Sequence, residues 1–137
     1  MMKGTDMSDR VDYFDDIAEL QKDVGFTQAV RVGEMVYLSG TAALKPDFTA
    51  AHPGDFDKQL EFVYDAIGRS LAHFGANHND IVREVMYVTD MQKLRDAIPK
   101  RKQYYGDGPF PASTGVEVRS LVLPELMIEV EVSARLP

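Results

Sequence analysis

The sequence contains no cysteine. This absence excludes disulfide bonds, thiolate metal sites and a thiol nucleophile, and it fits a reducing cytoplasm. Histidine is also scarce, and none of the three residues, His52, His73 and His78, has helical spacing to another ligand. A glycine-rich phosphate loop is missing too. We therefore expect no metal ion and no organic cofactor.

Long hydrophobic runs are lacking as well. No segment approaches the roughly 20 apolar residues of a membrane helix, and residues 1–10 lack the apolar core of a signal peptide. The chain has 15 Lys and Arg against 22 Asp and Glu, so its net charge is −7. Nucleic acid, a polyanion, is a poor default partner for such a chain. We expect a cytoplasmic protein that binds neither nucleic acid nor membranes.

The length and composition are typical of one globular domain. The chain has 137 residues, of which 45% are hydrophobic and 27% charged. These values allow a real core but not two full domains. We expect residues 1–10 to be a flexible N-terminal segment and residues 11–137 to form a single domain.

Patterning in the first half predicts a β-hairpin and a long helix. Apolar runs at Ala29–Val32 and Met35–Ser39 flank a Gly-Glu turn, as in a hairpin. Asp55–Phe74 carries apolar residues at helical spacing, with Asp55 as N-cap and Gly75 just past the end. Residues 11–24 fit either a helix or an edge strand, and residues 41–54 read as a loop.

The second half predicts a further strand, a short helix and two C-terminal strands. Residues 81–89 form the first strand, and the helix starts at Pro99 as its first residue and runs to Tyr105. The C-terminal strands lie on either side of a Pro124-Glu125 turn.

The last strand alternates in polarity. One set comprises Met127, Glu129, Glu131 and Ser133, and the other Ile128, Val130 and Val132. A period of two places these sets on opposite faces of a strand. Either the carboxylates lie on the wet face of an antiparallel sheet, or one of them lines a cleft.

These elements predict an α+β fold with two helices on one face of a mostly antiparallel sheet. The uncovered face favours an oligomer. Three positions combine polar side chains with a glycine or with the backbone of a predicted strand: Ser39-Gly40, Ser113-Thr114-Gly115 and Glu129. Such groups can bind a small acid or an imine, and a glutamate can position a water molecule.

Four segments, in order, resemble the Rid family (reactive intermediate deaminase, also YjgF-type or endoribonuclease L-PSP). They are Gly25-Phe-Thr-Gln-Ala-Val-Arg-Val-Gly33, Met35-Val-Tyr-Leu-Ser-Gly-Thr41, Phe110-Pro-Ala-Ser-Thr-Gly-Val-Glu-Val118 and Met127-Ile-Glu-Val-Glu131. The resemblance covers about residues 24 to 136 of the chain.

The resemblance implies a chorismate-mutase-like fold with a six-stranded sheet and a homotrimer. Clefts between subunits would bind a small-molecule metabolite, and Glu129 would position water for attack on an imine or enamine. The implied substrate-binding residues are Phe26, Ser39, Gly40, Ser113, Thr114 and Gly115.

The chain departs from this pattern at three cleft positions. Ser113 stands where deaminases of the family have a carboxylate-binding arginine, Phe26 stands where they have a tyrosine, and the position that matches their cleft asparagine falls near Ile98. A short hydroxyl does not substitute for a bidentate cation, so arginine-dependent hydrolysis of 2-imino acids is not expected. Arg119 could supply a substitute charge. It lies roughly 20 Å along an extended strand from Ser113, which is too far for the same cleft but leaves a neighbouring subunit's cleft open. The chain resembles the branch without the arginine.

Three functions remain open from the sequence. The first is a Rid-type hydrolase, and the second is a binding or sensing module that uses the same clefts without chemistry. A ribonuclease is disfavoured by the net charge and by the lack of a histidine pair.

Overall fold

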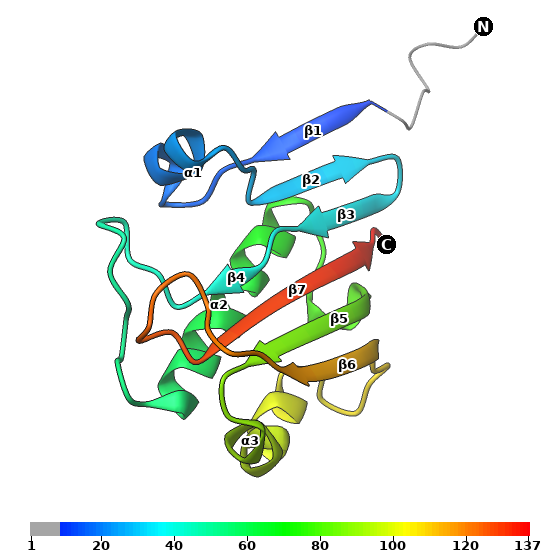
Figure 1. Cartoon of the computed structure of the whole chain (residues 1–137). Helices are drawn as coiled ribbons and strands as arrows, with labels where there is room; N and C mark the ends of the chain where they lie inside the picture. Colours follow the sequence, from blue (N-terminus) through cyan, green and yellow to red (C-terminus); the bar gives the residue numbers. More distant parts are fainter. Residues whose placement is uncertain (1–8) are drawn as a thin grey trace, which may run out of the picture.

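The described residues, 9–137 of a computed structural model, form one mixed sheet with helices against it (Figure 1). The strand order is β1-β2-β3-β7-β5-β6, and the short β4 also pairs with β7. The strands are β1 Arg10–Tyr13, β2 Ala29–Val32, β3 Met35–Leu38, β4 Thr41–Ala42, β5 Ile81–Val88, β6 Ala112–Glu117 and β7 Ile128–Arg135. All pairs are antiparallel except β5 with β6. The α+β prediction is confirmed.

The strand count differs from the predicted six. The described sheet has seven strands, because the two residues of β4 pair with β7 inside the segment that was predicted to be a loop. Residues 11–24, which fitted either a strand or a helix, contain parts of both β1 and helix α1 (Ala18–Val24). Residues 1–8 of the predicted flexible segment lie outside the described range, and Arg10 begins β1.

Helix α2 (Phe56–His73) matches its prediction closely. The Asp55 side chain accepts a hydrogen bond from the backbone N–H of Lys58 at 3.0 Å, as an N-cap does. Gly75 follows the helix with a φ of 77°, a conformation that favours glycine. In Figure 1, α2 lies behind the sheet and α3 lies below it, near the edge strand β6. Leu94 of α3 belongs to the same buried cluster as the side chains of α2.

The prediction that the second helix begins at Pro99 is wrong. Helix α3 spans Met91–Gln103 and contains the proline. Asp90 caps it by accepting bonds from the N–H groups of Gln92 and Lys93, and Leu94 and Ala97 are buried. The cap and this buried stripe outweigh the hydrogen bond that is lost at the proline. A short 3₁₀ helix, η2 (His78–Asp80), precedes β5.

The core lies between β7 and α2. Ile128, Val130 and Val132 are buried on the helix side of β7, in one cluster with Leu60 and Ile67 of α2. Each such side chain contributes about 1.5–3 kcal/mol when fully buried. The predicted alternation is confirmed, and the glutamates of β7 face the uncovered side of the sheet from a firmly anchored strand.

The two C-terminal strands do not pair with each other. β5 lies between them, and β6 is an edge strand whose six residues are all exposed. Within the described residues, no helix is both long and apolar enough to cross a membrane.

Candidate functional site

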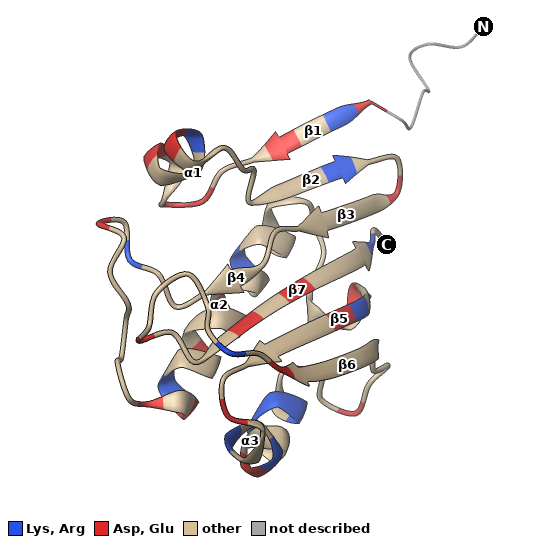
Figure 2. Cartoon of the chain, viewed as in Figure 1, with Lys and Arg blue, Asp and Glu red and all other residues tan. Residues whose placement is uncertain are grey.

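Glu129 occupies a fixed position on the open face of the sheet. Its backbone pairs with Ala42 of β4 on one side and with Tyr87 of β5 on the other. Its side chain is partly buried. Glu131 lies two residues further along the same face and accepts a hydrogen bond from the Tyr87 hydroxyl. Figure 2 shows acidic residues along β7 and a concentration of basic residues on α3.

The Glu129 carboxyl group lies directly against Gly40. A Cβ atom added to Gly40 would lie 2.9 Å from Cδ and 3.2 Å from Cγ of Glu129. Any side chain at position 40 would therefore displace the carboxyl group. The fold thus brings together two of the predicted site residues that are distant in the sequence.

The environment of Glu129 favours its protonated form. Burial raises the pKa of the Glu129 carboxyl above its ordinary value, and the nearby charge of Glu131 raises it further. A carboxylate with a raised pKa is a stronger base than a free one, which suits a group that accepts a proton from water.

Ser39 directly follows β3, and Phe26 lies shortly before β2, the strand that pairs with β3. The Ser39 hydroxyl donates a 2.6 Å hydrogen bond to the carbonyl of Thr27, and the Ser39 N–H donates to the carbonyl of Gln28 at 2.9 Å. Both bonds fasten the end of β3 to the chain before β2. The Ser39 proton is thus engaged, while its oxygen can still accept a bond from a ligand.

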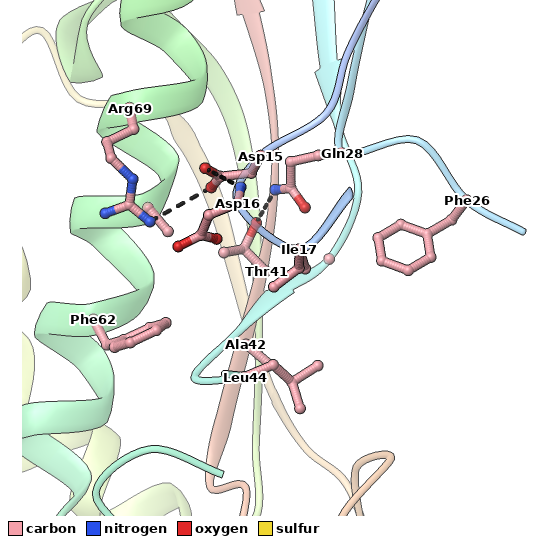
Figure 3. Close-up of a pocket in the computed structure, with 12 residues that line it drawn as sticks. Asp15, Asp16, Ile17, Phe26, Gln28, Thr41, Ala42, Leu44, Phe62 and Arg69 are labelled. Atoms are coloured by element: carbon pink, nitrogen blue, oxygen red, sulfur yellow. Dashed lines mark hydrogen bonds and ion pairs between the residues drawn. The ribbon is translucent and has the colours of Figure 1, made fainter. Parts of the chain in front are cut away.

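Phe26 and Gly40 also line a small pocket between β4, α2 and the segment that links β1 to α1 (Figure 3). Inside it, the Gln28 side chain donates a 2.9 Å bond to the Thr41 hydroxyl, and Asp15 pairs with Arg69 at 3.4 Å. The sequence did not predict this pocket, because its lining residues come from segments that are distant in the sequence and local patterns do not show which segments pack together.

The three predicted residues of β6 do not share one direction. Thr114 lies on the open face, in the row that passes through Val85 to Glu131. Ser113 and Gly115 face the helices, and a Cβ atom at Gly115 would lie 3.1 Å from the Leu94 side chain. One subunit therefore brings Gly40 and Glu129 together but holds Ser113 and Gly115 on the other side of the sheet.

A buried polar cluster lies under Ser113. Glu84 of β5 is fully buried and accepts hydrogen bonds from the hydroxyls of Tyr64 and Tyr105 and from the Arg101 guanidinium. Ser113 Oγ lies 2.9 Å from Glu84 Oε1 and 3.0 Å from Arg101 Nη2. The cation beside Ser113 is thus Arg101 of α3, a residue that was not among the predicted site residues.

Sequence comparison assigns the family. The model of the family described as Endoribonuclease L-PSP matches residues 17–136. The chain belongs to the Rid/YjgF (endoribonuclease L-PSP) family. A RutC family protein of Sulfurisphaera tokodaii is 30% identical over 112 residues, covering 81% of this chain and 88% of the relative. The mouse protein named 2-iminobutanoate/2-iminopropanoate deaminase is 26% identical over 96 residues, 70% of each chain.

Solved structures of the Rid family share this fold. Rv2704 from Mycobacterium tuberculosis, a member of the YjgF/YER057c/UK114 family, superposes with a TM-score of 0.80 at 29% identity, covering 93% of this chain and all of that one. A Rid family protein of unknown function from Yersinia pestis gives a TM-score of 0.75 at 26% identity, with 82% and 88% covered.

Two further observations concern Ser113 and the candidate cation Arg119. Ser113 is held in the buried cluster by Glu84 and Arg101, and Arg119 lies beyond Glu117, the last residue of β6. Among residues 9–137, no group of three or more His, Asp and Glu side chains could hold a metal ion.

Proposed function

We propose that this chain hydrolyses a small imine, an enamine or a related unsaturated metabolite, with Glu129 positioning the water. The observation that carries the proposal is the Glu129 carboxyl group itself. It stands partly buried on a rigid strand, against a glycine, with a raised pKa. The name of the mouse relative supports this reaction type at 26% identity.

The reaction needs only one proton carrier. Glu129 would accept a proton as the water oxygen bonds to the imine carbon, and it would return that proton to the nitrogen. The C–N bond then breaks, so that a carbonyl compound and ammonia leave. The second water proton remains on the hydroxyl group of the addition intermediate until the C–N bond breaks; it then leaves the oxygen while the nitrogen gains a proton, so that imine and water give the carbonyl compound and ammonia without a redox step.

We further propose that the working site lies between subunits of a homotrimer. Within the described residues, Glu129 faces the uncovered side of the sheet, while Ser113 and Thr114 lie on the exposed edge strand β6. Tyr37 and Val116 are 48% and 37% exposed although they are large and hydrophobic. A neighbouring copy that covers this face would bury them and enclose the carboxylate.

A non-catalytic binding or sensing module is the second candidate. Ser113 favours it, because its hydroxyl is engaged by Glu84 and Arg101 and supplies no free charge. Such a module would keep the clefts and the assembly but would not release ammonia.

Two glutamate substitutions test the proposal. Glu129→Gln keeps the shape and hydrogen bonding but removes the base, so turnover should fall at least about a hundredfold while the assembly stays intact and the melting temperature does not fall. Glu34→Gln, an exposed substitution in the turn between β2 and β3, removes the same charge away from the site and should retain most of the turnover. Equal losses in both variants, or a dissociated Glu129→Gln assembly with unchanged activity per trimer, would refute the role of Glu129.

A further inference from the structure

The cluster beneath Ser113 is fully hydrogen-bonded. Glu84 Oε1 accepts from Arg101 Nε at 2.6 Å and from Arg101 Nη2, and Glu84 Oε2 accepts from the Tyr64 and Tyr105 hydroxyls at 2.7 Å each. With Ser113 as a further partner of Oε1, both carboxylate oxygens are saturated. These hydrogen bonds hold Glu84 in an ion pair with the Arg101 guanidinium.

Arg101 is close to the surface but is not a free cation. Its side chain is 13% exposed, and its guanidinium lies 5.0 Å from the centre of the Tyr105 ring. Burial lowers the pKa of Arg101, but the charge and hydrogen bonds of Glu84 more than offset this and leave the pKa above its ordinary value. The guanidinium stays charged, and its charge is matched by one carboxylate in direct contact.

A ligand at Ser113 would therefore meet a pair whose net charge is zero. A ligand carboxylate would be attracted by Arg101 and repelled by Glu84 from similar distances. On the open face of the sheet, Glu129 and Glu131 carry negative charge and Arg83 of β5 carries one positive charge. The proposed trimer would bring this face of one subunit to Ser113 of its neighbour. An uncharged molecule would not be repelled by Glu84, and a protonated imine would be attracted by the neighbouring Glu129.

We propose that Glu84 sets the substrate class of the site: by neutralising Arg101 next to Ser113, it makes the site select uncharged or cationic imines and enamines over those that carry a carboxylate. This inference rests on the proposed function, in which Ser113 borders the ligand site. Glu84 acts through Arg101 and need not touch the ligand.

Calorimetry with two matched probes tests the proposal. Pyruvate and pyruvamide have similar shapes but differ by one negative charge. The wild type should bind pyruvamide at least as tightly as pyruvate. Glu84→Gln keeps the hydrogen-bonding shape but frees the charge of Arg101, so it should strengthen pyruvate binding by about tenfold or more and leave pyruvamide binding within about twofold. Asp107→Asn, an exposed substitution in the turn before β6, adds the same net charge and should change neither affinity.

Ser113→Arg is a second variant in case Glu84→Gln folds poorly. It adds an unpaired cation without removing the buried carboxylate, and it should shift the preference toward pyruvate in the same direction. A wild type that prefers pyruvate, or a pyruvate-to-pyruvamide ratio that is unchanged in both variants, would overturn the inference while leaving the hydrolysis proposal intact. Failure of every variant to bind either probe would count against the ligand site itself, and hence against both.

Discussion

Removal of the Arg101 side chain should destabilise the fold strongly. Arg101→Leu would leave the fully buried Glu84 carboxylate without its cation, while the bonds from Tyr64 and Tyr105 would remain. Breaking one side of a buried ion pair costs about 3–5 kcal/mol. Because Arg101 is 13% exposed and the tyrosines remain, we expect the lower end of this range, about 3 kcal/mol.

Urea unfolding measures this change directly. Arg95 lies on the same helix, is exposed and donates a hydrogen bond to Gln92, so Arg95→Leu is the matched control and should cost less than about 0.5 kcal/mol. The double variant Glu84→Gln/Arg101→Leu should recover more than half of the loss, because no buried charge is then left unpaired. A cost below about 1 kcal/mol for Arg101→Leu would show that Glu84 and Arg101 do not stabilise the fold as a buried ion pair.

Four further results are expected. Light scattering at micromolar concentration should give about three times the monomer mass of 15.3 kDa, and a stable monomer would contradict the shared clefts. Turnover of 2-iminopropanoate should be weak, about tenfold to a hundredfold below that of arginine-bearing relatives in a coupled assay; equal rates would show that another group binds the carboxylate. Gly40→Ala should displace the Glu129 carboxyl and abolish turnover, whereas full activity would mean that this contact is not part of the site. The pKa of Glu129 is raised in the folded state, so its contribution to stability is lost as the pH rises above 4.5, the ordinary pKa of a glutamate. Between pH 4.5 and 7, the melting temperature of Glu129→Gln should therefore rise relative to that of the wild type. Parallel pH profiles of the two melting temperatures would contradict this.

Local signals in the sequence predicted most of the elements. The alternation of β7 and the cap of α2 at Asp55 are interactions between near neighbours, so they can be read from a short window. The start of α3 was missed, although its cap at Asp90 is equally local. Pro99 is a strong local stop signal, but the cap at Asp90 and the tertiary contacts of Leu94 prevail over it.

The site was only partly predictable for a related reason. Glu129 and Gly40 were identified as separate candidates, but their contact depends on β4, a two-residue strand with no pattern of its own. The role of Arg101 was missed because an arginine between two lysines of a helix is ordinarily expected to be exposed to solvent. Only the parallel pairing of β5 with β6 places Ser113 beside Glu84 and reveals the cluster.

The proposed hydrolysis is tested most directly by measuring ammonia release from an uncharged imine that an amine oxidase generates in situ in the assay mixture. The wild type should accelerate the release well beyond the uncatalysed rate, and Glu129→Gln should return it to near that rate. If the wild type binds small ligands but leaves the rate of ammonia release unchanged, the chain is a binding module and the proposed hydrolysis is wrong.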